Sequence, residues 1–476
     1  MGWSPMWTTQ DTLLMVSALA AIVLVIVLIT TKIKMHAFLA LMIGSLFMGL
    51  LAGVVTDKLS PEKVALSFEV GVGSVLGNVG VVIALGTMLG KLLSESGGAQ
   101  QIADTLLRHA KPRSVPWIMA LVAGIIGIPM FFEIGLVLLL PLILTMAREV
   151  QHHFEGTDQE GAVRRSNVYI MVGIPALAGL SVLHGLVPPH PGPLVAISAI
   201  HADLGQTLLI GLIIAIPTVI IAGPLYAHVA ARFAHPHPTQ KLLDQVAQTR
   251  RVDNPPSFGT TLFTILLPVA LMLLRTLAEI TLPKNSGLLK WAEFVGEPIV
   301  ALLISLIVAM FTFGVSRGFG GKKITEFLGD ALLPAAGILM IIGAGGGFKQ
   351  VLIDSGIADA IKKAAESSHL SPLLLAWGVA VLIRLATGSA TVATVTAAGI
   401  MAPLVASPDI TVNKPLVALA IGAGSLFFSH VNDAGFWLVK EFFGMSVGDT
   451  FKSWSVMETI ISVVGLGFIM LASLIL

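Results

Sequence analysis

The chain has 476 residues, of which 55% are hydrophobic and only 12% charged, and its mean hydropathy is +0.91. A soluble domain carries about 25% charged residues, so this composition excludes a soluble protein and indicates a polytopic membrane protein. The net charge of +1 identifies no partner, because charge in a membrane protein is distributed loop by loop. The absence of cysteine excludes disulfides, thiolate metal sites and cysteine nucleophiles.

The first apolar run, residues 13–31, has about the 20 residues that a helix needs to cross a hydrocarbon core of roughly 30 Å. No small-residue cleavage signal follows it, which predicts a retained helix and no signal peptide. Further apolar runs begin near residues 36, 70, 116, 134, 167, 206, 260, 298, 331, 372, 392, 415 and 455. The polar stretch 230–258 lies between them near the middle of the chain, and we expect it to be a cytoplasmic linker.

Segments of the two halves resemble each other in the same order, which predicts an internal repeat. Residues 36–41 correspond to 297–302, 86–97 to 345–356, 205–207 to 448–450, and His184 to His430. We expect a first repeat at 1–229 and a second at 259–476. With about ten spanning helices, five in each half, the repeats are inverted in the membrane. The Lys and Arg residues then fall mainly on the linker side, which places the linker in the cytoplasm and both termini outside.

Each half also contains two interruptions within apolar segments. The segments 116–146 and 372–405 are broken near 127–135 and 387–393, and we predict that each is a re-entrant hairpin. The segments 168–200 and 415–442 are broken by HGLVPPHPGP at 184–193 and SHVNDAGFW at 429–437. Broken helices at matching positions of two halves indicate the substrate site of a transporter, and non-helical backbone at membrane depth requires protein or a water-filled cavity around it. The fold expected is therefore all-α, with four breaks converging near the midplane.

Two carboxyl groups lie in these breaks. Glu133 stands in an aromatic and aliphatic run, and Asp433 stands beside His430 and Asn432. A carboxylate in the bilayer is costly and gains a proton readily, so both are predicted proton carriers. The alternative for Glu133 is a structural carboxyl that is hydrogen-bonded to the hairpin backbone.

Other polar residues of the breaks are candidate substrate ligands. His184, His190 and His430 titrate near neutral pH and can donate hydrogen bonds, although a histidine on an apolar helix is often a packing residue and His190 could simply cap a turn. Pro189 belongs to a cluster that shapes the break and presents backbone carbonyls.

Gly388, Ser389 and Thr391 mark the start of a helix whose free N–H groups suit an anion, or else an ordinary contact between helices. We expect Arg384 to extend from a span end to the membrane surface, with pairing to an anion as the lesser alternative.

No catalytic motif is present: neither a zinc-protease, a serine-hydrolase nor a phosphate-binding loop pattern occurs in the chain. An enzyme, a metal site and a cofactor are therefore not expected, and transport would draw on an ion gradient. Gly345, Gly346 and Gly347 are interpreted as a place of close helix packing, and so is Asn78.

The blocks PPHPGP at 188–193, GSATVA at 388–393 and FSHVNDAGFW at 428–437 resemble the bacterial gluconate permease family. LGK at 89–91, SGGA at 96–99 and KSWS at 452–455 agree with it, and the resemblance covers essentially the whole chain. Ala434 departs from the pattern, because relatives often have proline there. The resemblance implies proton-coupled uptake of gluconate or a related sugar acid across the bacterial inner membrane. It further implies a homodimer and an elevator-like movement, with no nucleic-acid partner.

The expected binding mode places the substrate carboxylate against residues 388–391. Its hydroxyl groups would contact Asn432, His184 and His430, with the proton on Glu133 or Asp433. D-serine is the alternative substrate within the family. A channel for small solutes is the alternative of another class, and an intramembrane hydrolase is disfavoured by the missing motifs.

Overall fold

The computed structural model describes residues 7–56, 59–108, 110–154, 167–238, 252–357, 359–361, 363, 370–407 and 412–476. Parts of the loop 149–167 and of the linker 230–258 therefore lie outside the described residues. The described chain is helical, as the sequence predicts, and it contains no strand.

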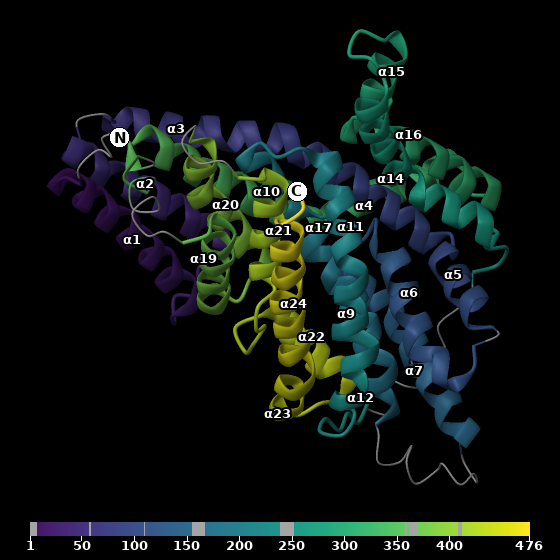
Figure 1. The fold of residues 1–476 in the computed structure, drawn as a ribbon. Coiled ribbons are helices and arrows are strands. Elements are labelled where there is room, and N and C mark those ends of the chain that lie inside the picture. The colour runs from purple at the N-terminus through teal and green to yellow at the C-terminus, as the bar shows by residue number, and fades with distance from the viewer. Residues whose placement is uncertain are drawn as a thin grey trace.

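The described helices fall into a first half of the chain, up to residue 230, and a second half, from residue 258 (Figure 1). Those of the first half are α1 (Thr9–Thr30), α2 (Ala37–Thr56), α3 (Pro61–Val75), α4 (Val81–Glu95), α5 (Gly98–Leu107), α6 (Val115–Gly127), α7 (Phe132–Phe154), α9 (Val168–Leu186), α10 (Pro191–Ile200), α11 (Leu204–Ile220) and α12 (Tyr226–Ala230). Those of the second half are α14 (Phe258–Thr281), α15 (Gly287–Val295), α16 (Pro298–Ala309), α17 (Gly321–Asp354), α19 (Pro372–Thr387), α20 (Ala390–Ala406), α21 (Lys414–Ser425), α22 (Ala434–Phe443), α23 (Val447–Thr450) and α24 (Val456–Ala472).

Nine helices of the described chain are long and apolar enough to cross a membrane, against the ten or so spans expected. The difference lies at 415–442, because this segment is divided into α21 and α22, and neither part is long enough alone. The segments 116–146 and 372–405 are also divided, into α6 and α7 and into α19 and α20. All the interruptions predicted from the sequence are therefore present as breaks between helices.

Short π-helical turns join several of the long helices. They cover Leu76–Gly80 between α3 and α4, Ile221–Leu225 between α11 and α12, Met310–Gly314 after α16, and Phe451–Ser455 between α23 and α24. Each such turn shifts the side chains that follow it around the helix axis, and π-turns are frequent at functional sites. The one at Phe451–Ser455 brings Trp454 to the cavity described below.

The broken helices form the core of the molecule. Figure 1 shows α9, α21 and α24 in the middle, with α1 and α2 on one side and α14 to α16 on the other. Every residue of α21 from Pro415 to Ser425 is buried, as are nearly all of α9. The two helices approach closely at glycines: a Cβ on Gly422 would lie 2.0 Å from the carbonyl oxygen of Gly185.

The glycines at 345–347 are confirmed as a place of close packing. A Cβ on Gly346 would lie 2.5 Å from the carbonyl oxygen of Gly71 in α3, and a Cβ on Gly347 would lie 2.3 Å from the ring of Phe68. Backbones that approach this closely are typical of helices packed through small residues in membranes. The helices α3 and α17, one from each half of the chain, are joined by these contacts.

Candidate functional site

A cavity of about 260 Å³ lies where the break between α19 and α20, the break between α21 and α22, and the helices α7, α9 and α24 meet. We call it the central cavity. It is lined by Phe132, Glu133, Ser181, His184, Arg384, Thr387, Gly388, Ser389, Ala390, Thr391, Leu426, Asn432, Asp433, Ala434, Gly435, Trp454 and Glu458. Its volume is below the range of about 300–1,000 Å³ that holds drug-sized ligands, so it suits a small solute. Most of the residues predicted from the sequence therefore share one site.

Arg384 and Asp433 form an ion pair at the wall of the central cavity. The guanidinium Nη2 lies 2.5 Å from Asp433 Oδ2, and Nη1 donates to the carbonyl oxygen of Gly388 at 2.5 Å. The Arg384 side chain is only 3% exposed, so the expectation that it extends to the membrane surface is wrong. It stands in the last turn of α19, which ends at the break beside Gly388. Its Nε is a buried donor without a partner in the described chain.

Asp433 has further partners that hold it in place. Its Oδ1 accepts a hydrogen bond of 2.9 Å from the backbone N–H of Gly435, so Asp433 caps the N-terminus of α22. Ser429 donates its hydroxyl to Oδ2, and Trp454 Nε1 donates to Ser429 Oγ at 2.7 Å. A single network of hydrogen bonds therefore links the end of α19, the segment before α22 and the π-turn before α24.

Hydrogen bonds join the end of α19 to the break between α21 and α22. The side-chain amide of Asn432 donates to the carbonyl oxygen of Leu385 at 3.0 Å, and His430 Nε2 lies 3.0 Å from the same oxygen. These contacts satisfy a carbonyl that the end of α19 leaves without a helical partner. His430 does not line the central cavity, whereas Asn432 does.

Three helix N-termini lie at the central cavity. Phe132 begins α7, Ser389 caps α20 by accepting from the N–H of Val392 at 3.3 Å, and Asp433 caps α22. The N-terminus of a helix carries free N–H groups and the positive end of the helix dipole. Together with Arg384 they make this cavity a favourable place for an anion. The sequence predicted only the helix start near Gly388.

Glu133 and His184 face the cavity from the first half of the chain. Glu133 lies in the first turn of α7 and its side chain is exposed. His184 lies in the last turn of α9, and its Nδ1 is buried without a partner in the described residues. Both groups are therefore available to a solute or a proton in the cavity.

Glu458 and Ser181 also line the central cavity, and the sequence reasoning missed both. Ser181 Oγ donates to Glu458 Oε1 at 2.5 Å, and Glu458 is 1% exposed. A carboxyl within the apolar segment 456–472 was the signal that could have found this residue, because ionisable groups in spans are rare and usually functional. Ser181 gave no comparable signal.

Pro189 and His190 lie apart from the central cavity. They line a cavity of about 20 Å³ together with the break between α6 and α7, including Pro129 and Met130. The Pro188–Pro189 peptide bond is cis, and His190 caps α10 without using its side chain. The rings of His190 and His184 are 5.9 Å apart, so this small cavity adjoins the central one through the two imidazoles.

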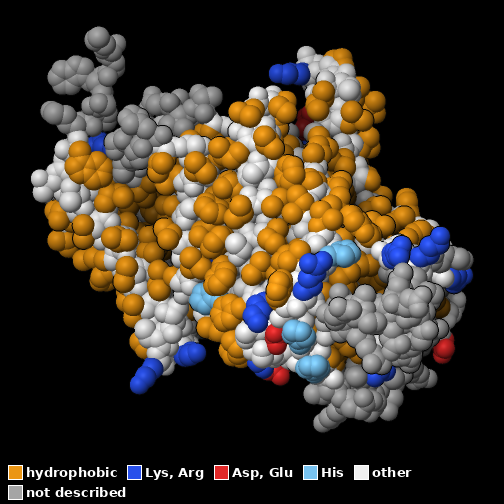
Figure 2. All heavy atoms as spheres, turned by 60° about the horizontal axis from the view of Figure 1, so that its bottom comes forward, with side chains coloured by type: hydrophobic (Ala, Val, Ile, Leu, Met, Phe, Trp, Pro, Cys, Tyr) orange, Lys and Arg blue, Asp and Glu red, His pale blue; other side chains and the backbone are white. Residues whose placement is uncertain are grey.

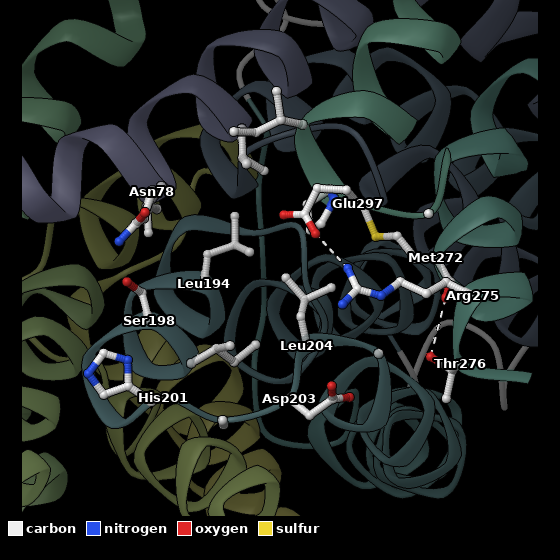
Figure 3. Close-up of a pocket in the computed structure, with 18 of the residues that line it drawn as sticks. Asn78, Leu194, Ser198, His201, Asp203, Leu204, Met272, Arg275, Thr276 and Glu297 are labelled. Atoms are coloured by element: carbon white, nitrogen blue, oxygen red, sulfur yellow. Dashed lines mark hydrogen bonds and ion pairs between the residues drawn. The ribbon is translucent and has the colours of Figure 1, made fainter. Parts of the chain in front are cut away.

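A larger cavity of about 350 Å³ lies between the start of α11 and the helices α14 and α16 (Figure 3). In Figure 3, Asn78 and His201 lie on one side of it and Arg275 and Glu297 on the other. Asn78 is exposed to this cavity, so its interpretation as a packing residue is wrong. Arg275 is paired with Glu297 at 2.5 Å and with Glu279 at 2.8 Å. The cation of Arg275 is therefore paired with two carboxylates, whereas Arg384 in the central cavity is paired with one.

Within the described residues, no group of three or more His, Asp or Glu side chains is arranged to hold a metal ion. The polar groups of the central cavity are thus an arginine, carboxyls, an imidazole, hydroxyls and an amide. This set can bind an anion that carries hydroxyl groups, and it can exchange protons.

Comparison with known proteins assigns the chain to a family. The model of the GntP family permease matches residues 13–475. The "Gluconate permease" of Pseudomonas aeruginosa is 52% identical over 98% of this chain and 99% of its own length. The "High-affinity gluconate transporter" of Escherichia coli is 44% identical over 93% of this chain and 96% of its own length. The crystal structure of the YdaH transporter of Alcanivorax borkumensis has a similar fold, with a TM-score of 0.62 at 16% identity, covering 92% of this chain and 97% of that one. The chain is a transmembrane transporter and not an enzyme, and it belongs to the GntP family of permeases.

Proposed function

We propose that this permease takes up gluconate, or a closely related sugar acid, together with protons across the bacterial inner membrane. The names of its relatives support the substrate class. The observation that carries the proposal is the central cavity, where the buried guanidinium of Arg384 lies among three helix N-termini. A hydroxylated monoanion fits both the charge and the size of this site.

The substrate carboxylate binds beside Gly388, Ser389 and Thr391 at the start of α20, where it faces free N–H groups and Arg384. The hydroxyl groups of the substrate contact His184 and Asn432 in the same cavity.

Three further residues keep the site in shape. His430 holds the end of α19, and Pro189 and His190 hold the adjoining break of the first half. Their direct contact with substrate stays a prediction.

The charges of the central cavity support the proposed proton coupling. Asp433 neutralises Arg384 in the empty site, so an incoming carboxylate competes with Asp433 for the same guanidinium. Once it loses that partner, Asp433 is a carboxylate beside a second anion, and taking up a proton removes the repulsion. Glu133 would be repelled by the incoming anion in the same way. It is exposed to the cavity, and no cation contacts it among the described residues. Substrate binding and proton uptake at Asp433 or Glu133 therefore favour each other.

Uptake of an anion into the cell requires a co-transported proton, because the membrane potential opposes the entry of negative charge. Gluconate carries one negative charge, and an inside-negative potential opposes its entry by about 2.3 kcal/mol at 100 mV. One proton makes the cycle electroneutral, and a second makes the potential a driving force.

The architecture that we propose is a pair of inverted repeats, 1–229 and 259–476, joined by the linker 230–258. It is supported by the matching order of elements: three long helices, a divided hairpin, a broken helix and a final long helix in each half. An odd number of spans inverts the second half relative to the first. The divided pairs α6–α7 and α19–α20 would be the re-entrant hairpins, and their movement as a unit would give the elevator-like cycle.

The proposed orientation has the linker in the cytoplasm and both termini in the periplasm. In Figure 1 the start of α1 and the end of α24 lie on the upper side, away from α12 and α23. Figure 2 shows Lys, Arg and His side chains gathered along one side of a broad hydrophobic surface, on the face that comes forward. Arg232, after α12, and Lys452, before α24, are exposed basic residues near that end. Basic residues concentrate on the cytoplasmic side of a membrane protein. A homodimer is proposed from the resemblance alone.

The purified protein in proteoliposomes tests the proposal. A carrier saturates, shows counterflow and concentrates labelled gluconate when a proton gradient is imposed, whereas a channel does none of these. Competition by a panel of sugar acids and by D-serine separates the sugar-acid substrate from the alternative within the family. Failure to concentrate gluconate against its gradient overturns the proton symport, and strong competition by D-serine alone overturns the substrate class.

A further inference from the structure

A third carboxyl of the central cavity, Glu458, has surroundings unlike those of Glu133 and Asp433. It lies in the first turn of α24 and is 1% exposed, yet it forms part of the cavity lining. The hydrogen bond that it accepts within the described chain comes from Ser181 Oγ of α9, a neutral group, at 2.5 Å. Asp433, in contrast, is paired with a guanidinium.

The charged groups that face Glu458 do not neutralise it. The cavity contains one cation, Arg384, whose Nη groups are bonded to Asp433 and to the carbonyl oxygen of Gly388. The other titratable groups of the cavity are Asp433, Glu133 and His184. The helix α9, which carries His184, also packs on α24. The other elements that pack on α24 are α11, α21 and the π-turns Ile221–Leu225 and Phe451–Ser455, and they place no acid or base in the cavity lining. A buried carboxylate without a paired cation is far costlier than its protonated form, so these surroundings favour the protonated form of Glu458.

We infer that Glu458 is a proton-binding site of the transport cycle, distinct from the Arg384–Asp433 pair and from Glu133. This inference rests on the proposed proton symport. In one half of the cycle the O–H bond of the carboxylic acid breaks and the proton passes to cavity water; in the other half the carboxylate recovers a proton from water. Ser181, which donates to the oxygen that becomes charged, stabilises the deprotonated form and so sets the proton affinity.

The test counts protons per gluconate. Purified protein in proteoliposomes is given a fixed gluconate gradient, and the imposed pH difference or membrane potential that stops net flux yields the proton number. The Glu458→Gln variant keeps the size and hydrogen bonding of a protonated Glu458 and removes the exchangeable proton. Its count is expected to be lower than the wild type by one, with gluconate counterflow retained. Glu326→Gln, at an exposed carboxyl of α17 paired with Lys323, is the matched control and keeps the wild-type count.

A milder variant keeps the inference testable if Glu458→Gln does not fold. Ser181→Ala leaves the carboxyl in place and removes its hydrogen-bond donor, so the proton is held more tightly. The midpoint of the pH profile of gluconate uptake is expected to move up by about one pH unit. An unchanged proton count in Glu458→Gln, or an unmoved profile in Ser181→Ala, overturns the inference. If the wild-type protein couples no proton to gluconate, the proposed proton symport itself is wrong. That outcome is distinct from failure of the inference about Glu458, in which the wild type couples protons and the variants do not differ from it.

Discussion

Gly388 and Asn432 touch through their backbones, although they belong to different broken elements. Gly388 adopts a left-handed φ of +73°, and a Cβ built on it would lie 2.3 Å from the carbonyl oxygen of Asn432. Only glycine meets both demands at this position. The contact joins the break between α19 and α20 to the break between α21 and α22. Both residues line the central cavity, so the contact helps to set its shape.

Replacing Gly388 by alanine is therefore expected to damage the site. The left-handed backbone and the close contact together cost about 1–3 kcal/mol, which lowers the melting temperature of the purified protein and its gluconate uptake. Gly378→Ala is the matched control, because Gly378 lies in the same helix α19 with open space around its Cβ position. The control is expected to be neutral or slightly stabilising. Equal behaviour of the two variants contradicts the account of this contact.

Arg384 provides the second prediction. Arg384→Lys keeps the charge but loses the planar fork that reaches Gly388 and Asp433 together, so the KM for gluconate is expected to rise roughly tenfold to a hundredfold. Arg275→Lys changes the paired arginine of the larger cavity and is expected to leave KM within about twofold. Initial uptake rates over a range of gluconate concentrations measure both. The assignment of the anion site is wrong if Arg275→Lys raises KM and Arg384→Lys does not.

The third prediction concerns Glu133 and Asp433, the two carboxyl groups that the sequence analysis predicted to carry protons. Glu133→Gln and Asp433→Asn each remove a group that takes up a proton when substrate arrives, so accumulation of gluconate driven by a pH gradient is expected to fall. Exchange of labelled for unlabelled gluconate needs no net proton movement and is expected to persist. Uphill uptake that is undiminished in both variants contradicts their role in coupling.

The orientation can be tested with single cysteines, because the chain has none of its own. Lys322→Cys and Lys284→Cys both replace exposed residues, at the start of α17 and after α14. A membrane-impermeant maleimide added to intact cells is expected to label the cysteine at 284 and to leave the one at 322 unlabelled until the cells are opened. The opposite pattern reverses the proposed topology.

Much of the fold could be predicted from the sequence, because it depends on patterns that are local. Apolar runs fixed the helices, and glycine, proline and polar clusters fixed where they break. The helices α9 and α10 end and begin at Leu186 and Pro191, within the predicted break, and α19 ends next to Gly388. The packing of Gly346 on Gly71 was foreseeable for the same reason, since small residues in an apolar helix indicate close approach.

The composition of the site was only partly predictable, because it depends on contacts between distant segments. Arg384 was expected at the membrane surface, since nothing in its own helix shows that α19 ends inside the protein. Its pairing with Asp433 joins residues 49 positions apart. Ser181 and Glu458 are separated by 277 positions, and no local pattern links them. His430 was predicted to contact substrate, but its ring is turned to a backbone carbonyl of α19.

The most direct test of the central cavity as the transport site compares wild type and Arg384→Ala in proteoliposomes under an imposed pH gradient, acidic outside. Labelled gluconate inside the vesicles is measured at steady state, with the correct folding of the variant verified by its melting temperature. The wild type is predicted to concentrate gluconate above the external level, and the variant is predicted to show no accumulation. Equal accumulation by a folded Arg384→Ala contradicts the account.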